Sequence, residues 1–278
     1  MAYFDLQNPD HAYAFGFLQA DGHLHQGPGR KGQLTVEINA HDRPLLESFQ
    51  RLFPVNSSIT ERCRSTNFAT RSETAVWSVC ALDFREELKA LGLPAGRKSA
   101  TIAPPQLPHS ERDYLRGLID ADGSLGRTAA GLPFVSLTTD STEVIWYFSN
   151  YMKQLTGVVH TPRRNRRDQI YNLIYTIEDA VELARTLYYP GCLALPRKAT
   201  ASEFVASWLR PPGMRRQVEP RRSWTADEDD ILLAAATPAE AAAQLDRSVK
   251  SCVMRHWRLV GPQRSRKRSV PSGATVSP

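Results

Sequence analysis

The sequence of 278 residues predicts an α+β protein, in which two copies of an αββαββα repeat precede a small all-α domain of three helices. Three observations support this fold class. A nine-residue motif occurs twice, each copy is followed by strand and helix patterns in the same order, and the composition changes after a proline-rich break near residue 211. Each repeat spans about 100 residues, the size of an ordinary folded unit.

The repeated motif reads AFGFLQADG at residues 14–22 and LRGLIDADG at residues 115–123. Four positions are identical at a constant offset of 101 residues: Gly16, Ala20, Asp21 and Gly22 recur as Gly117, Ala121, Asp122 and Gly123. A second pair of segments, GRK at 96–98 and PRK at 196–198, repeats at an offset of 100. Self-similarity at a fixed spacing indicates a duplicated structural unit.

Apolar periodicity gives the elements of each repeat. Helices are expected where apolar residues recur at helical spacing, and strands where polar and apolar residues alternate. In the first repeat the expected order is helix 11–20, strand 33–39, helix 43–53, strands near 58–65 and 74–80, and helix 82–91. In the second it is helix 112–121, strand 134–138, helix 143–155, strands 157–163 and 169–177, and helix 178–188.

Composition sets the domain boundaries. We expect the first repeat at 1–103, a proline-rich linker at 104–111, the second repeat at 112–209, a linker at 210–222, a helical domain at 223–262 and a disordered basic tail at 263–278. Residues 211–278 hold 12 Lys and Arg against 7 Asp and Glu, so most of the net charge of +6 lies in this last quarter. A basic excess favours a polyanionic partner.

The composition also bears on location. No apolar run is long enough to cross a membrane, and the first residues lack the pattern of a signal peptide. The four cysteines lie far apart, which is typical of a reducing compartment and argues against a zinc cluster. We therefore expect an intracellular protein, in the cytoplasm or nucleoid of a bacterium or phage-infected cell, with no membrane partner.

The motif itself has a geometric and a chemical meaning. Gly16 and Gly117 would let the two helices approach closely, and Gly22 and Gly123 are expected to end them as C′ residues. An aspartate at a helix C-terminus faces the negative end of the helix dipole, which is unfavourable unless a cation lies nearby. If the helices end side by side, two carboxylates and the helix-end carbonyls form an oxygen-rich site suited to Mg²⁺.

A single Asp-Gly pair is more often a plain helix stop than a site, because this dipeptide is common in turns. Its occurrence twice, in matched surroundings, argues for function. At these residues the chain resembles the LAGLIDADG family, and the second copy departs from the namesake string only at Arg116. The resemblance covers about residues 10–205.

The resemblance implies a monomer with two pseudo-symmetric repeats whose sheets lie along the major groove of double-stranded DNA. It implies a site-specific homing endonuclease that cuts both strands with Mg²⁺, for which Mn²⁺ or Ca²⁺ substitutes in binding. The target would be long and asymmetric. The metal ligands carried over are Asp21, Asp122 and the helix-end residues Ala20 and Ala121.

Other site residues follow from the same resemblance. Lys98 and Lys198 follow their aspartates at similar distances and match the active-site lysines of the family, where a cation neutralises developing charge. His41 and Asp140 are candidates for positioning water. Gln19 stands where the second copy has Asp120, so the halves are not equivalent, and we expect a structural role for this position.

Candidate DNA contacts are polar and basic side chains on the wet faces and turns of the expected sheets. In the first repeat they are Arg30, Lys31, Gln33, Thr35, Glu37, Arg62 and Arg64. In the second they are Ser136, Thr138, Arg163, Arg164, Arg166 and Arg167, the last four at an expected hairpin tip.

The C-terminal segment resembles a Myb/SANT-type helix-turn-helix. Thr225 and Ser248 are expected to cap its first and third helices, and Pro238 opens the second. Trp224 and Trp257 are the expected core aromatics. Such three-helix units bind DNA or protein, and on the DNA interpretation the contacts are Lys250, Arg255 and Arg258.

Two other functions remain open. A non-cleaving transcription regulator with the same fold would not need the two acids, both of which this chain keeps. An RNA maturase that assists intron splicing would need the fold without necessarily needing Asp21 or Asp122.

Overall fold

The computed structural model describes residues 2–27, 30–64, 72–214 and 224–261, without the side chains of residues 64 and 72. The chain divides into two compact units, Met1–Pro212 and Gly213–Pro278. The first unit contains both copies of the motif. None of the helices in the described ranges is long and apolar enough to span a membrane.

The first repeat has the expected order of elements. It consists of α1 (Pro9–Asp21), β1 (His23–Gln26), β2 (Gly32–Asn39), a short 3₁₀ helix η1 (Ala40–Asp42), α2 (Arg43–Leu52), β3 (Ser57–Arg64), β4 (Ser72–Val79) and α3 (Leu82–Ala90). The strands form an antiparallel sheet in the order β1-β2-β4-β3. Along β2 the apolar residues are buried and the polar residues between them reach solvent, as the alternation predicts.

The second repeat departs from the expected order. Its elements are α4 (Glu111–Asp122), β5 (Gly123–Arg127), β6 (Pro133–Thr139), α5 (Thr142–Thr156), β7 (Tyr171–Thr176), α6 (Glu178–Leu187) and α7 (Pro196–Ala206). The strands form an antiparallel sheet in the order β5-β6-β7.

The strand expected at 157–163 is therefore wrong. The only pairing near it is an isolated bridge between Arg164 and Tyr171. Gly157 ends α5 in the left-handed conformation, with φ of 76°, and Pro162 has no amide hydrogen to give to a sheet. Helix α7, in contrast, was not expected at all.

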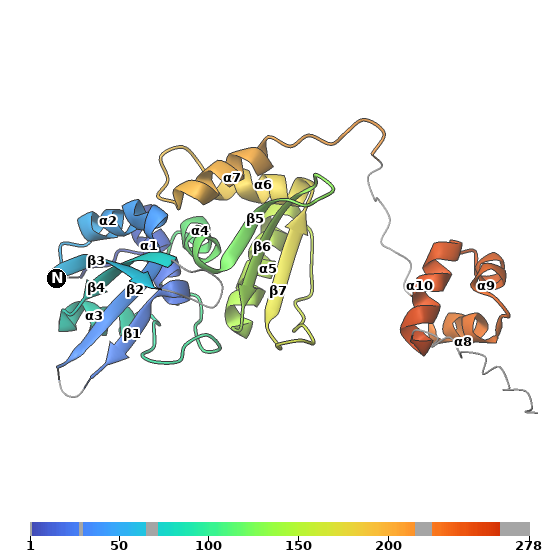
Figure 1. Ribbon diagram of the computed structural model, residues 1–278, viewed down its shortest axis with the longest axis horizontal. Helices are drawn as coiled ribbons and strands as arrows, with labels where there is room; N and C mark the ends of the chain where they lie inside the picture. Colours follow the sequence, from blue (N-terminus) through green and yellow to red (C-terminus); the bar gives the residue numbers. More distant parts are fainter. Residues whose placement is uncertain (1, 28–29, 65–71, 215–223, 262–278) are drawn as a thin grey trace, which may run out of the picture. The chain divides into compact units, whose positions relative to one another are not determined.

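Helices α1 and α4 pack against each other at the centre of the first unit, with one sheet on each side (Figure 1). A Cβ atom on Gly16 would lie 2.2 Å from the carbonyl oxygen of Tyr114, and one on Gly117 would lie 2.1 Å from that of Tyr13. The contacts are reciprocal, because Tyr13 and Tyr114 are themselves separated by 101 residues. The two backbones are close enough that only glycine fits, as the motif predicts.

The glycines that end these helices serve a different purpose from the one expected. Gly22 and Gly123 are extended, with φ of −69° and −93°, and do not adopt a left-handed C′ conformation. A Cβ on Gly22 would lie 2.5 Å from the carbonyl oxygen of Leu18, and one on Gly123 would lie 2.7 Å from that of Ser136. Space, not backbone conformation, requires glycine here.

One core of apolar side chains joins the two repeats, and it includes Phe17, Leu18, Trp77, Leu118 and Phe148. Arg116, the departure from the namesake string, is buried in this region. Its guanidinium forms an ion pair of 2.5 Å with buried Asp113 and donates to the carbonyl oxygens of Leu187 and Leu193. Arg116 therefore ties α4 to the segment that follows α6.

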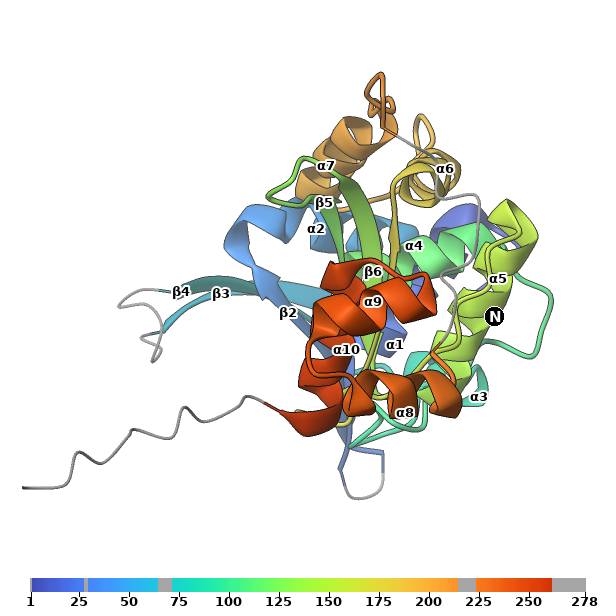
Figure 2. The same cartoon turned by 90° about the vertical axis from the view of Figure 1, so that its right-hand side faces the viewer.

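The second unit contains α8 (Ala226–Ala234), α9 (Pro238–Leu245) and α10 (Val249–Val260), shown from another side in Figure 2. Thr225 and Ser248 cap α8 and α10 as expected. Leu232, Leu245 and Cys252 belong to a small core, against which Trp224 packs. Trp257 is 54% exposed, so its expected place in the core is wrong.

Candidate active site

Asp21 and Asp122 are the last residues of α1 and α4, the two helices that meet at their glycines. Among the described residues, neither carboxylate accepts a hydrogen bond or forms an ion pair, and both are exposed. The surrounding protein nevertheless desolvates them. Burial, reinforced by the negative charge of Asp122, raises the pKa of Asp21 to about 6, and burial also raises the pKa of Asp122.

Two lysines lie beside these acids. The ammonium group of Lys98 donates to the carbonyl oxygens of Gln19 and Ala20 at the end of α1. That of Lys198 donates to the carbonyl oxygens of Asp120, at 2.7 Å, and Gly123, at 2.9 Å, at the end of α4. Each lysine thus places a cation at the negative end of a helix dipole, where it is stabilised.

The charges of the four groups act on one another. Burial lowers the pKa of both lysines to about 8. The negative charges of Asp122 and Asp21 oppose this effect at both lysines, and at Lys198 the charge of Asp120 opposes it most. In the other direction, both lysines lower the pKa of each aspartate. The structure therefore brings together the four residues that the sequence singled out, in a partly desolvated cluster of two acids and two cations.

Gln19 lies two residues before the end of α1 and is buried. Its side-chain amide donates to the carbonyl oxygens of Gly92, at 2.9 Å, and Ala103, at 3.0 Å, and its oxygen accepts from the hydroxyl of Tyr114. Residues 92 and 103 flank Lys98, so Gln19 holds both ends of the segment that carries this lysine.

Asp120 occupies the matching position on α4. It accepts hydrogen bonds from the hydroxyls of Tyr13, at 2.7 Å, and Tyr188, at 2.6 Å, and from the amide of Leu195, at 2.7 Å. Leu195 directly precedes α7, which carries Lys198. Both positions therefore have the structural role expected of them, one through a neutral amide and the other through a buried carboxyl.

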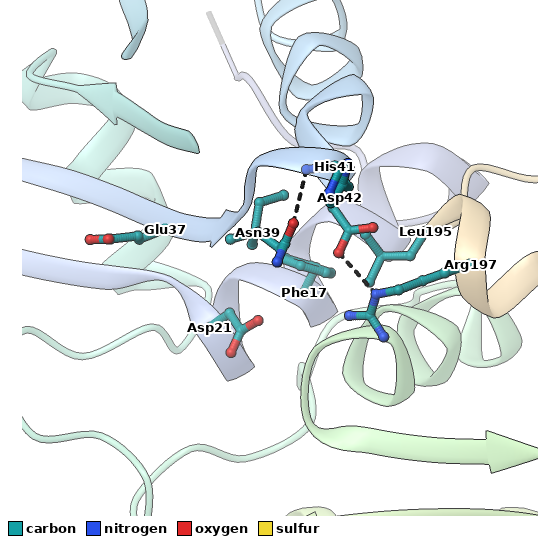
Figure 3. Close-up of a pocket in the computed structure, with 9 residues that line it drawn as sticks. Phe17, Asp21, Glu37, Asn39, His41, Asp42, Leu195 and Arg197 are labelled. Carbon is teal, nitrogen blue, oxygen red and sulfur yellow. Dashed lines mark hydrogen bonds and ion pairs between the residues drawn. The ribbon is translucent and has the colours of Figure 1, made fainter. Parts of the chain in front are cut away.

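A pocket of about 440 Å³ opens beside Asp21 (Figure 3). His41, expected to position water, lines it together with Asn39 and Arg197. Asp140, the other residue expected to position water, is not among the lining residues and forms an ion pair of 2.5 Å with Arg164. The structure thus brings only His41 into the neighbourhood of Asp21.

The donor set of this site consists of oxygens. No group of three or more His, Cys, Asp and Glu side chains that could hold a metal occurs in the described part of the chain. The candidate ligands are the carboxylates of Asp21 and Asp122 and the carbonyl oxygens at the helix ends, of which that of Ala20 already accepts from Lys98. Oxygen donors without nitrogen or sulfur suit a hard divalent cation that keeps several waters, such as Mg²⁺.

The candidate DNA contacts of the first repeat lie along one sheet. Gln33, Thr35 and Glu37 alternate with buried residues on β2. Arg62 on β3 lies 3.5 Å from Glu37, so these two side chains partly neutralise each other. Arg30 and Lys31 are exposed just before β2, and the side chain of Arg64 lies outside the described part of the structure.

In the second repeat, the exposed candidates are Thr138 on β6 and the arginines of the turn that precedes β7. Ser136 is only 6% exposed, so the expectation that it lies on a wet face is wrong. It is buried because its hydroxyl points toward the neighbouring strand and donates to the carbonyl oxygen of Ser124. Arg164 and Arg167 have acidic partners in Asp140 and Asp168.

In the second unit, Lys250 and Arg258 are exposed on α10. Arg255 is held by Asp229 through two hydrogen bonds, the first at 2.7 Å, and contacts the ring of Trp224. Arg255 therefore stabilises the three-helix unit, whatever else it contacts.

Sequence reasoning missed two residues of the pocket, Arg197 and Asp42. The Nε of Arg197 donates to Asp42 over 2.9 Å, which joins the second repeat to the first. The repeated Arg-Lys pair was a signal for Arg197, but nothing in the sequence indicates a contact between residues that are 155 positions apart.

Residues 110–188 match the family model of the LAGLIDADG-like domain. This segment runs from the beginning of α4 to the end of α6 and includes Asp122. The second repeat is thus similar in sequence to a LAGLIDADG-like domain. No curated protein matches the chain in sequence.

Several solved structures are similar to the chain. One is the homing endonuclease I-WcaI bound to its DNA recognition sequence, with 15% identity and a TM-score of 0.47 over 67% of this chain and 85% of that one. Variants of the homing endonuclease I-DmoI have 18% identity and a TM-score of 0.45 over 69% and 95%. I-SmaMI bound to uncleaved DNA in the presence of calcium has 13% identity and a TM-score of 0.41 over 65% and 84%.

Proposed function

We propose that the protein is a site-specific DNA endonuclease of the homing type, which hydrolyses both strands of a long asymmetric target. The observation that carries this proposal is the pair of carboxylates at the ends of α1 and α4, each with a lysine beside it and neither with a hydrogen-bond or ion-pair partner among the described residues. Asp120, two residues earlier on α4, is instead buried and accepts three hydrogen bonds, so its role is structural. The match of residues 110–188 to a LAGLIDADG-like domain supports the same function.

In this proposal Asp21, Asp122 and the carbonyl oxygens of Ala20 and Ala121 hold Mg²⁺ or a similar divalent cation. When bound, the cation supplies activation of water and charge stabilisation of the leaving oxygen in phosphodiester hydrolysis. The two ammonium groups balance the two carboxylates in charge and limit the repulsion between them.

Lys98 and Lys198 act on the phosphate. Their ammonium groups are held at the helix ends by carbonyl oxygens, so little side-chain motion is needed to bring them next to a phosphate that enters the site. There they neutralise charge that develops in the transition state. His41 lies on the wall of the pocket beside Asp21 and orients water.

The polar faces of the two sheets bind the duplex in a pseudo-symmetric arrangement, with one sheet for each half of the target. The residues that contact base edges are Gln33, Thr35 and Thr138. Backbone phosphates are bound by the exposed Arg163 and Arg166. Because the side chains of the two sheets differ, a monomer reads an asymmetric sequence.

The second unit adds affinity through Lys250 and Arg258 on α10. The three capped helices of this unit are compatible with a helix-turn-helix. Helix α10 also exposes apolar residues, among them Val253 and Trp257, so its surface is not purely basic. We assign it a supporting role in DNA binding.

The test is cleavage of a randomised plasmid library in Mg²⁺ by the wild-type protein and by Asp122→Asn. Removal of one carboxylate from the pair should abolish double-strand cleavage while specific binding in Ca²⁺ persists, because the Asp and Asn side chains are nearly isosteric. A matched control is Asp179→Asn, which removes a carboxylate of α6 to which no role in metal or DNA binding is assigned.

Specific binding with no cleavage by the wild-type protein would favour the transcription regulator. Binding and splicing of intron RNA, unaffected by Asp122→Asn, would favour the maturase. Either result would overturn the proposed endonuclease.

A further inference from the structure

Arg197 belongs to α7 of the second repeat, but its side chain lines the pocket that holds Asp21 of the first repeat. Figure 3 shows its guanidinium group inside this pocket, next to Asp42 and across from Asp21. The carboxylate of Asp42 is 6% exposed and accepts from Nε, whereas the side chain of Arg197 is 59% exposed. Asp42 therefore fixes one edge of the guanidinium.

The other edge remains available. Among the described residues, no hydrogen-bond partner of the two terminal nitrogens of Arg197 occurs. A planar guanidinium with one edge fixed and two N–H groups free matches the geometry of a phosphate, which accepts two parallel hydrogen bonds. The positive charge of Arg197 also lowers the pKa of Asp21, which places it within electrostatic reach of that carboxylate.

The first repeat offers no equivalent. Arg97, which corresponds to Arg197 at the offset of 100, is exposed and forms no ion pair or hydrogen bond with any residue in the described ranges. The pKa of Asp122 is lowered by the two lysines, whereas that of Asp21 is lowered by both lysines and by Arg197. The two aspartates thus have different cationic surroundings.

We propose that Arg197 binds a backbone phosphate of one DNA strand beside Asp21 and that Asp42 positions it for this contact. The two strands of the target are then cut at unequal rates. The inference rests on the proposed endonuclease function for its effect on cleavage, but the phosphate contact itself does not require cleavage.

The first experiment measures the cleavage rate of each strand. The substrate is a duplex selected by the wild-type protein, with a different dye on each 5′ end, in Mg²⁺ under single-turnover conditions. Arg197→Ala should slow one strand by about tenfold or more, the scale of one lost hydrogen bond to a charged group, and the other strand much less. Asp42→Asn should change the ratio of the two rates in the same direction.

Arg97→Ala is the matched control, because it removes the same side chain from the corresponding place in the first repeat. It should leave the ratio of the two rates unchanged. Equal slowing of both strands by Arg197→Ala, or an equal change of the ratio by Arg97→Ala, would overturn the inference. A thermal melt of each variant separates a loss of folding, which would slow both strands together, from a loss of the contact.

The second experiment needs neither a target nor a metal. Binding to a random duplex of roughly 40 bp, several helical turns, is measured in EDTA at a series of salt concentrations. Arg197→Ala should reduce the slope of log Kd against log salt by about 1, the contribution of one phosphate contact, and Arg197→Lys should restore it. An unchanged slope would refute the phosphate contact. If the wild-type protein cuts no DNA but the slope still falls, the endonuclease function fails and the contact stands.

Discussion

At the scale of single residues, burial decides the protonation of the acid at the end of α1. Asp21 has neighbours of both signs, but desolvation is the largest influence on its pKa and raises it to about 6. The sequence identifies this residue because the motif is duplicated. It could not identify Arg197 or Asp42, because their contact depends on how α7 of one repeat meets η1 of the other.

The raised pKa predicts that metal binding weakens in mild acid. A carboxyl with its ordinary pKa of 3.8 is still ionised at pH 5, whereas one with a pKa of about 6 is mostly protonated there. Because the cation binds the ionised form, affinity for Ca²⁺ should fall about tenfold as the pH is lowered from 7.5 to 5. Calorimetric titration with Ca²⁺ across this range checks the prediction. Constant affinity down to pH 5 would contradict it, and Asp21→Asn should bind weakly at every pH.

At the scale of elements, the contact between α1 and α4 depends on glycine. The sequence predicts this contact and most helices and strands, because their apolar periodicity is strong. The failure at 157–163 has a local cause: the valines there are typical of a strand, but Pro162 and the arginines that follow favour a turn over a sheet. The exposed Trp257 shows a second limit, since residue type alone does not fix which face of a helix is buried.

Substitution of a central glycine tests the packing of the two helices. Alanine is the better helix former by about 0.5–1 kcal/mol, yet Gly117→Ala would place a Cβ 2.1 Å from the carbonyl oxygen of Tyr13. We expect a net destabilisation of about 1–3 kcal/mol, typical of overpacking, measured as a lower midpoint of urea unfolding. Gln154→Ala, at an exposed position of α5, is the control and should change little. A urea midpoint for Gly117→Ala at or above that of the wild type would show that the helices can move apart without loss of stability.

At the scale of the whole molecule, the two copies of the repeat have diverged from each other. Gln19 and Asp120 perform the same task with different charge. Within the residues that the structure describes, Arg197 has a partner that Arg97 lacks, and one repeat has four strands where the other has three. A single chain allows such differences, since each half is encoded separately. A dimer of identical repeats would have to keep both halves the same.

The second unit provides a prediction at this scale. Replacement of Lys250 and Arg258 by alanine should weaken DNA binding and lower the salt slope by about 2, one for each phosphate contact. Deletion of residues 211–278 should act in the same direction. Fluorescence anisotropy at several salt concentrations gives both values. The control is the pair Lys153→Ala and Arg185→Ala, which removes the same charge from helices of the first unit and should leave the slope nearly unchanged.

The reciprocal contact of Gly16 and Gly117 also bears on how such a protein could change its target during evolution. Because main-chain atoms meet directly there, we expect side-chain substitutions on the sheets to leave the spacing of the two helices, and of the aspartates at their ends, unchanged. In the proposed endonuclease this spacing would determine the stagger between the two cuts. Mutations on the sheets could then change the base pairs that are recognised while the length of the overhang is inherited unaltered.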